Sequence, residues 1–372
     1  MRSITKTVYG AVVLFVSSLF ITPASAEAQE FRVRGRLHMD GFYGISQADT
    51  FSNGFNNRRA RMGMAGTITD GWDGQIEIDF ADGGIDPKDI RLRRTFGNGG
   101  RLWIGQYKVP QGLNQLTSSN EITFIERSAI NNVIADSRRL GIAWDYFNGP
   151  LGFKTMVFGR ALGQRAALVD DMPLGLAFRG VFAPEIGGGI LHIGASAVYE
   201  NLMDNNIARL RDRPEARDSK GGATRLIDAA VPDAESTFKA GLELLFISGP
   251  FSIEGEYLQA AVHRSEGNNP AFNGFSIQSS YVLTGESRSY SRGLVGSVSP
   301  DGDAGAWEVA LRYSFMDLND AGFTGGKQRN ITLGLNHYIT SRLRFMSNVV
   351  FVNVDYLDEN PVLLVLRAQF SF

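Results

Sequence analysis

Arginines recur at every second position in three separate parts of the chain, and they are the residues with the clearest chemistry. The pairs are Arg34 with Arg36, Arg59 with Arg61, and Arg91 with Arg93. Guanidinium groups bind phosphate or carboxylate oxygens through two parallel hydrogen bonds and stay charged at any relevant pH. A row of such groups lets an anion leave one site by moving to the next, which conduction requires. The pattern therefore predicts an anion pathway.

The same arginines have a structural alternative. Segment 72–82 carries Asp73, Glu77 and Asp79 on one face. Arg61 or Arg91 could simply pair with Glu77 or Asp79, because opposite charges on neighbouring strands stabilise each other. Both interpretations stay open on the sequence alone.

No constellation for catalysis or metal binding accompanies the arginines. The four histidines, at 38, 192, 263 and 337, are scattered, without metal-ligand spacing and without a serine in a nucleophile elbow. The chain has no Cys, which leaves no thiolate nucleophile and no disulfide framework. We therefore expect no catalytic residue, no metal and no cofactor.

The arginines lie on segments in which polar and apolar residues alternate. In 31–43, Arg34 and Arg36 share one face, while Val33 and Leu37 share the other. A period of two is typical of a β-strand with different environments on its two faces. About sixteen such segments of about ten residues suit an all-β transmembrane antiparallel β-barrel. They cover residues 31–43, 57–68, 72–82, 88–96, 101–109, 138–147, 151–160, 173–183, 190–200, 237–248, 250–260, 273–284, 306–316, 328–339, 342–353 and 362–372.

The connections between these segments alternate in length. Short turns rich in Gly, Asn, Asp, Ser and Pro alternate with long loops, as they do in outer-membrane barrels. The stretch 285–305 is the exception, since it falls on the short-turn side and is long. Either the strand count slips there or that side carries an ordered excursion.

Tryptophans help to separate a membrane barrel from a soluble β-sandwich. Trp72, Trp103, Trp144 and Trp307 all fall on the apolar face, each near the short-turn end of its segment. Aromatic side chains at one level are typical of the girdle where a barrel meets the membrane–water interface. A soluble sandwich gives no reason for that shared level.

The N-terminal 26 residues form a unit of their own. Residues 1–26 combine a positive start, a short apolar core and a small-residue cleavage site, which predicts a signal peptide; the barrel then spans 27–372. Net charge is −2 before cleavage and −4 after loss of Arg2 and Lys6. An acidic chain does not indicate a nucleic-acid partner.

The long connection at about 110–137 is unusually apolar, with residues such as Leu113, Phe124 and Ile130. A loop of that length must bury its apolar residues. Folding into the barrel would bury them and narrow the pore, which predicts an inward-folded third extracellular loop that forms a constriction. Packing outside, at a subunit contact, is the alternative.

Several motifs, taken together, resemble the phosphate-selective porins O and P over essentially the whole mature chain. The motifs are Asn57-Arg-Arg-Ala-Arg61, Asp79-Phe-Ala-Asp-Gly83, Gly105-Gln-Tyr-Lys-Val-Pro110, Leu116-Thr-Ser-Ser-Asn-Glu-Ile-Thr-Phe-Ile-Glu-Arg127, Arg138-Arg-Leu-Gly141, Leu283-Thr-Gly-Glu286 and Gly305-Ala-Trp-Glu-Val-Ala-Leu-Arg-Tyr-Ser314. The resemblance implies a trimeric barrel in the outer membrane of a Gram-negative bacterium, with outer-membrane lipid and small anions as partners.

The resemblance also implies roles for particular residues. An arginine ladder would feed a constriction that selects anions such as phosphate or polyphosphate. Ladder or wall residues would be Arg34, Arg36, Arg59, Arg61, Arg91 and Arg93. Constriction residues would be Lys108, Arg127 and Arg139, with Asp82 as an acidic partner.

Other features favour a less selective pore. Asn120 stands where the loop motif should carry a charge, and segment 72–82 brings three acids to the lumen. A general or weakly cation-preferring porin is therefore the alternative. A structural or adhesive barrel is a further one, and the mixed charges of loop 201–236 suggest a solvated surface loop.

Overall fold

The computed structural model describes residues 30–46, 50–81, 83–163, 173–219 and 224–372. The predicted signal peptide at 1–26 and Asp82 lie outside these ranges. Within them, no helix has both the length and the apolar character needed to cross a membrane.

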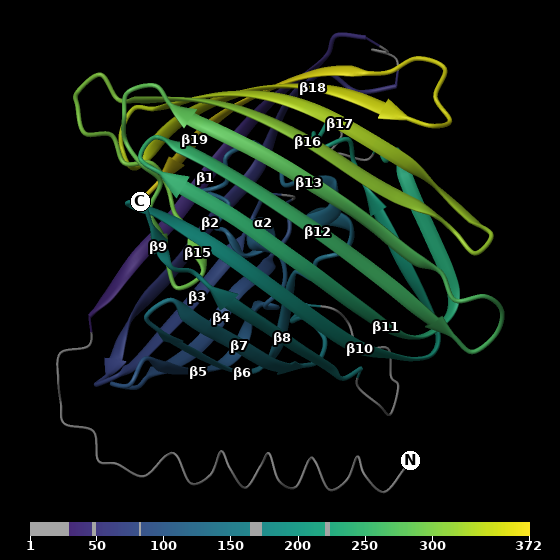
Figure 1. The fold of residues 1–372 in the computed structure, drawn as a ribbon, viewed down its shortest axis with the longest axis horizontal. Helices are drawn as coiled ribbons and strands as arrows, with labels where there is room; N and C mark the ends of the chain where they lie inside the picture. Colours follow the sequence, from purple (N-terminus) through teal and green to yellow (C-terminus); the bar gives the residue numbers. More distant parts are fainter. Residues whose placement is uncertain (1–29, 47–49, 82, 164–172, 220–223) are drawn as a thin grey trace, which may run out of the picture.

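Sixteen long antiparallel strands form a closed barrel (Figure 1). Each strand pairs with its neighbour along the chain, and β1 closes the ring by pairing with both β2 and β19. The strands are β1 (Phe31–Gly44), β2 (Gly54–Thr69), β3 (Trp72–Asp79), β4 (Asp86–Thr95), β5 (Gly100–Lys108), β6 (Arg138–Asn148), β7 (Leu151–Phe158), β8 (Gly175–Phe182), β10 (Gly189–Asp212), β11 (Ile227–Ser248), β12 (Phe251–Arg264), β13 (Ala271–Val282), β16 (Ala306–Asp320), β17 (Phe323–Tyr338), β18 (Leu343–Val354) and β19 (Val362–Ser371).

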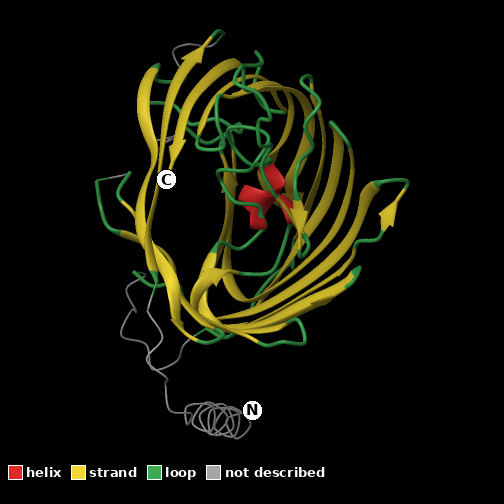
Figure 2. Cartoon of the chain, turned by 90° about the vertical axis from the view of Figure 1, so that its left-hand side faces the viewer, coloured by secondary structure: helices red, strands yellow, loops and turns green. Residues whose placement is uncertain are grey.

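The remaining elements are small. β9 (Glu185–Ile186) extends the pairing of β10, and β14 (Tyr290–Ser291) pairs with β15 (Leu294–Val295) in a separate hairpin. Two short helices, α2 (Leu113–Leu116) and α3 (Ala129–Val133), lie inside the barrel (Figure 2).

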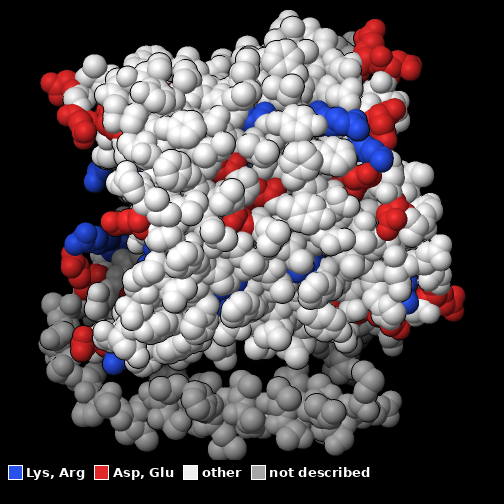
Figure 3. Space-filling view, in the orientation of Figure 1, with Lys and Arg blue, Asp and Glu red and all other residues white. Residues whose placement is uncertain are grey.

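Along the strands, apolar side chains are exposed and charged side chains are buried, which is the reverse of the arrangement in a soluble protein. In β12 the apolar Phe251, Ile253 and Tyr257 are exposed on the outside, whereas Glu254 and Glu256 are buried inside. The outer face is mostly uncharged, with many charged side chains at its margins (Figure 3). An apolar outside with a polar inside is the pattern of a barrel that spans a lipid bilayer.

The last residue takes part in barrel closure. Phe372 exchanges two main-chain hydrogen bonds with Gly35, at 2.9 and 3.1 Å. A Cβ on Gly35 would lie only 2.3 Å from Cζ of the Phe372 ring, so a glycine at this position lets the terminal ring lie against β1.

The segment from Val109 to Ser137 runs through the barrel interior and supplies an apolar core there. Ile130 and Ile134 pack on lumen-facing apolar side chains of β10 to β13 and β16, and Ile125 packs on those of β18 and β19. The barrel interior is thus filled on one side, and the space that remains lies against β1 to β5.

Two connections differ from the sequence-based predictions. Loop 201–236 is mostly strand, because β10 and β11 continue to Asp212 and from Ile227, so that only 213–226 connects them. The stretch 285–305 is an ordered excursion rather than a miscount. Its hairpin, β14–β15, folds into the lumen, where Arg292 pairs with Asp145 and Arg288 with Glu308.

The outward position predicted for Trp103 is wrong. Trp72, Trp144 and Trp307 share the outward face with exposed apolar residues, but Trp103 donates a hydrogen bond to the lumen-facing carboxylate of Asp145. The alternation in 101–109 predicts Gln106 and Lys108 on the polar face and Trp103, Tyr107 and Val109 on the apolar face. Lys108 ends the strand where the chain turns inward, and both Tyr107 and Lys108 line the interior.

Candidate functional site

A cavity of about 520 Å³ lies between strands β1 to β5 and the interior segment 109–137. We call it the basic cavity, because eleven of its described lining residues are Arg or Lys and Asp89 is the one acid among them. The basic residues are Arg34, Arg36, Arg58, Arg59, Arg61, Lys88, Arg91, Lys108, Arg127, Arg138 and Lys154.

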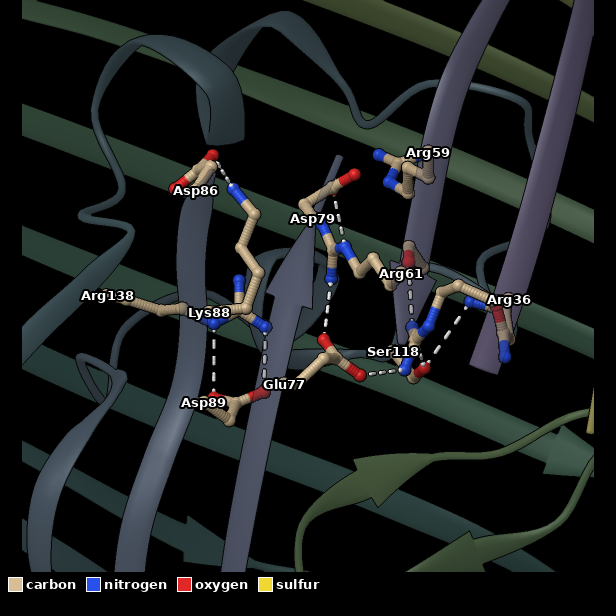
Figure 4. Close-up of polar contacts among 12 residues, drawn as sticks. Arg36, Arg59, Arg61, Glu77, Asp79, Asp86, Lys88, Asp89, Ser118 and Arg138 are labelled. Carbon is tan, nitrogen blue, oxygen red and sulfur yellow. Dashed lines mark hydrogen bonds and ion pairs between the residues drawn. The ribbon is translucent and has the colours of Figure 1, made fainter. Parts of the chain in front are cut away.

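The register of the first three strands places the central arginines. Arg36 of β1 faces Arg61 of β2, and Arg61 faces Asp79 of β3. Arg36 donates to Glu77 at 3.0 Å, and Arg61 donates to Glu77 at 3.1 Å and to Asp79 at 2.7 Å (Figure 4). The two arginines therefore share one acid and are held side by side.

These acids lie behind the arginines rather than on the wall of the basic cavity. Glu77 and Asp79 are each 7 % exposed, and neither lines the basic cavity, whereas Arg36 and Arg61 do. The pairing that the sequence offered as an alternative is confirmed for Arg61, which binds both Glu77 and Asp79. The carboxylates anchor the guanidinium groups, and the guanidinium groups line the basic cavity.

The next strands repeat this arrangement. Arg91 and Arg93 of β4 both donate to Asp73, at 2.9 and 2.7 Å. Arg138 of β6 donates to Asp89 through two hydrogen bonds of 3.1 and 2.9 Å. Paired guanidinium and carboxylate groups of this kind fix each other's orientation.

Two lining residues were missed because β-bulges carry them inward. His38 faces Arg59 while Met39 faces Asn57, which leaves Arg58 as an extra residue on β2. Arg58 turns inward and donates to Glu126 of the interior segment, at 2.9 Å for one of its two hydrogen bonds. Lys88 lies at a similar irregularity between β3 and β4. Alternation fails at a bulge, where two residues oppose one.

Lys108 and Arg127 hold the interior segment through its main chain. The Lys108 ammonium donates to the carbonyl oxygens of Gln115, Leu116 and Thr117, at 2.6, 3.0 and 2.9 Å. Arg127 donates to the carbonyl oxygen of Thr117 at 2.7 Å. Burial lowers the pKa of Arg127 to about 9, so its guanidinium is still charged at neutral pH.

Asn120 has a neutral partner at the position where a charge was expected. Its side-chain oxygen lies 2.9 Å from Nε2 of His38, and its carbonyl oxygen accepts from Gln369. Nδ1 of His38 lies 3.3 Å from Arg59. An amide suits this position because it can bind a histidine that already lies among cations.

Of the other predicted site residues that the structure describes, three line the basic cavity and the rest do not. Arg34, Arg59 and Arg91 line the basic cavity together with Arg36, Arg61, Lys108 and Arg127. Arg93 does not line it, and neither does Arg139, which pairs with Asp136 and Glu200. Asp82 lies outside the described residues.

Three lumen arginines on strands β16, β18 and β19 bind the main chain of the interior segment. Arg312, Arg344 and Arg367 donate to the carbonyl oxygens of Glu126, Ile122 and Ile125, at 2.9, 2.9 and 2.7 Å. All three are buried. They hold the interior segment in place and do not line the basic cavity.

A second cavity, of about 250 Å³, adjoins the first. We call it the vestibule cavity; Arg58 and Asn132 line both. Its other basic residues come from the β10–β11 connection and its flanks: Arg211, Arg213, Arg217 and Arg225. The predicted solvated surface loop is therefore wrong, since the connection turns inward: Glu215 reaches Arg312 and the Ala129 amide.

Comparisons with known proteins agree with this architecture. A family model described as "Phosphate-selective porin O and P" matches residues 31–372. Porin O of Pseudomonas aeruginosa is 27 % identical over 422 aligned positions, covering 99 % of this chain and 94 % of that protein.

Solved structures resemble the fold at low identity. OmpT of Vibrio cholerae in its trimer form has a TM-score of 0.60 at 12 % identity, covering 93 % of this chain and 100 % of that one. An anion-selective porin from Comamonas acidovorans has a TM-score of 0.58 at 15 % identity, with the same coverage.

Proposed function

The chain belongs to the family of phosphate-selective porins O and P and is an outer-membrane porin of a Gram-negative bacterium; from this premise we propose that it conducts small anions, phosphate among them. Solutes diffuse down their gradient, and the field of the lumen favours negative charge.

The lining of the basic cavity is the observation that carries this proposal. Among the described residues, eleven basic side chains line this cavity, against the single carboxylate of Asp89. Most of the compensating acids, such as Glu77 and Asp79, are buried behind their arginines. A cation in the cavity would meet like charge at all but one of the charged groups of the described lining, whereas an anion can exchange one guanidinium for the next.

A path for the anion follows from the two cavities. It enters the vestibule cavity, where five arginines outnumber Glu126, Asp212 and Glu215 in the described lining, passes Arg58, which lines both cavities, and reaches Arg36 and Arg61. The hydroxyl of Ser119, 3.0 Å from Nη1 of Arg36, adds a neutral donor beside the charged ones. Charged forks with a hydroxyl suit the oxygens of phosphate.

The proposal includes assembly and export. The protein acts as a homotrimer in outer-membrane lipid, by analogy with the trimer form of OmpT. It is made as a precursor whose residues 1–26 are cleaved during export.

Phosphate block of chloride current tests the proposal. Purified protein is inserted in a planar bilayer in KCl, and phosphate is titrated in, with equal ionic strength of added KCl as the control. We expect phosphate to reduce the chloride current at millimolar concentration while the KCl addition does not. Equal responses to the two salts would favour a general porin, and no current at all would favour a structural barrel.

A further inference from the structure

Trp103 is the one described tryptophan whose ring lies in the lumen, and the arginine pathway does not account for it. It lines the basic cavity together with Tyr107, whose ring centroid is 5.6 Å away. Its indole N–H donates to Asp145, a carboxylate that also binds Arg292 of the β14–β15 hairpin. A hydrated inorganic anion gains little from an indole ring, so this position calls for a different ligand.

Cations surround the ring. The Arg91 guanidinium lies 4.7 Å from the Trp103 ring centroid, and the Lys154 ammonium lies 4.0 Å from it and 5.0 Å from the Tyr107 ring. Arg91 is already bound to Asp73. Lys154 contacts the two rings and lines the cavity, and among the described residues it has no ion pair within 4 Å, although the Asp145 carboxylate acts on its charge from farther away.

The position along the strand separates Trp103 from Lys108. Trp103 lies five residues before Lys108 on β5, on the side of the short turn that precedes Gly100. At about 3.3 Å of rise per residue, the two positions are roughly 16 Å apart along the strand. Tyr107 adjoins Lys108 in the chain, and its ring lies 5.6 Å from that of Trp103, so the two rings continue the cavity wall from Lys108 toward the short turn.

We propose that Trp103, Tyr107 and Lys154 form a subsite for organic anions with a flat aromatic body, such as aromatic carboxylates. This inference rests on the proposed function, since it assumes that solutes cross the basic cavity. The carboxylate pairs with Lys154, and the flat body lies against the rings, where stacking and cation–π contacts favour it. Phosphate and small aliphatic acids use the arginines without this contact.

The test compares benzoate with acetate as blockers of the chloride current. Both carry one carboxylate, so their ratio of half-blocking concentrations isolates the ring. We expect benzoate to block at a concentration about tenfold below that of acetate, as contacts of one ring with aromatic side chains would produce. Cyclohexanecarboxylate, which is apolar but puckered, should block less well than benzoate.

Variants assign the effect to the subsite. Trp103→Leu should bring the acetate-to-benzoate ratio close to one, and Trp103→Phe, which keeps a ring, should retain most of it. Lys154→Met should weaken block by benzoate severalfold. Trp144→Leu is the matched control, because that indole faces outward on β6 and should leave the ratio unchanged.

The outcomes separate this inference from the proposed function, because the reversal potential is measured on the same channels. Equal block by benzoate and acetate, or a ratio unchanged in Trp103→Leu, would overturn the subsite even if the channel prefers anions. A ratio that Trp103→Leu abolishes supports the subsite even if the reversal potential shows no anion preference.

Discussion

Replacing Arg61 with Gln changes one pathway cation while keeping a polar side chain of similar length. Arg61 lines the basic cavity and binds Glu77 and Asp79. In the variant, Glu77 still has Arg36 at 3.0 Å, and Asp79 still accepts from the amides of Ala60 and Ala81. We therefore expect the barrel to assemble and the charge of the pathway to fall by one.

The size of the effect follows from Coulomb's law. A unit charge roughly 6 Å from a passing anion contributes about 0.7 kcal/mol in water and about 2.8 kcal/mol at an effective dielectric constant of 20. A water-filled pore beside protein lies between these limits. A loss of about 1 kcal/mol corresponds to a roughly fivefold lower anion-to-cation permeability ratio.

The assay is the reversal potential of the variant in a planar bilayer across a KCl gradient. Arg209→Gln is the matched control, because Arg209 makes a similar pair with Asp228 but is 51 % exposed and outside both cavities. The result that would refute the reasoning is a folded Arg61→Gln channel with the wild-type potential. An equal shift in Arg209→Gln would refute it too.

Three further predictions concern the interior segment. Lys108→Met removes the donor of three hydrogen bonds to carbonyl oxygens of the interior segment. We expect a noisier single-channel current and a lower anion preference. A variant whose current is as quiet as that of the wild type would contradict this. Glu215→Gln removes the carboxylate that pairs with the buried Arg312, and it should lower the free energy of unfolding by about 3–5 kcal/mol. The loss is measured as a lower unfolding temperature on heat-modifiability gels, and a wild-type unfolding temperature would contradict the prediction. Burial opposes ionisation of Glu126, but Arg58 overcomes this and holds the pKa of that carboxyl well below its ordinary value. The stability that this pair contributes is therefore fully present above the ordinary carboxyl pKa, and it is lost only as the pH falls through the lower pKa that Glu126 has in the folded protein. The conductance of the wild type should be constant from pH 7 to 5, whereas the conductance of Arg58→Met should change over this range.

Much of the fold was predictable because apolar residues that face lipid alternate with polar residues that face the lumen along each strand of a membrane barrel. Arg36, Arg61 and Arg91 were placed on the lumen face by that alternation. Pairing with Glu77 or Asp79 was predicted as an alternative for Arg61 and Arg91; it is confirmed for Arg61, whereas Arg91 pairs with Asp73. The alternation carried no information on whether the arginine or the carboxylate of an ion pair lines the cavity, since that depends on how far each side chain extends across the neighbouring strand.

The remaining differences have local causes. Arg58 and Lys88 enter the lumen through bulges, which leave no periodic signal. Trp103 was misplaced because two polar residues near the end of the strand, Gln106 and Lys108, were taken to define the lumen face of all of β5. The inward turns of 213–226 and 285–305 depend on contacts with distant strands, such as that of Glu215 with Arg312, and no local pattern encodes these contacts.

The reversal potential of the wild-type channel across a KCl gradient tests the central claim most directly. If the arginines form the surface that a solute meets and the acids lie behind them, chloride carries most of the current and the potential has the anion-selective sign. A potential near zero, or one of cation-selective sign, would mean that Asp73, Glu77 and Asp79 neutralise the arginines, and it would contradict the account.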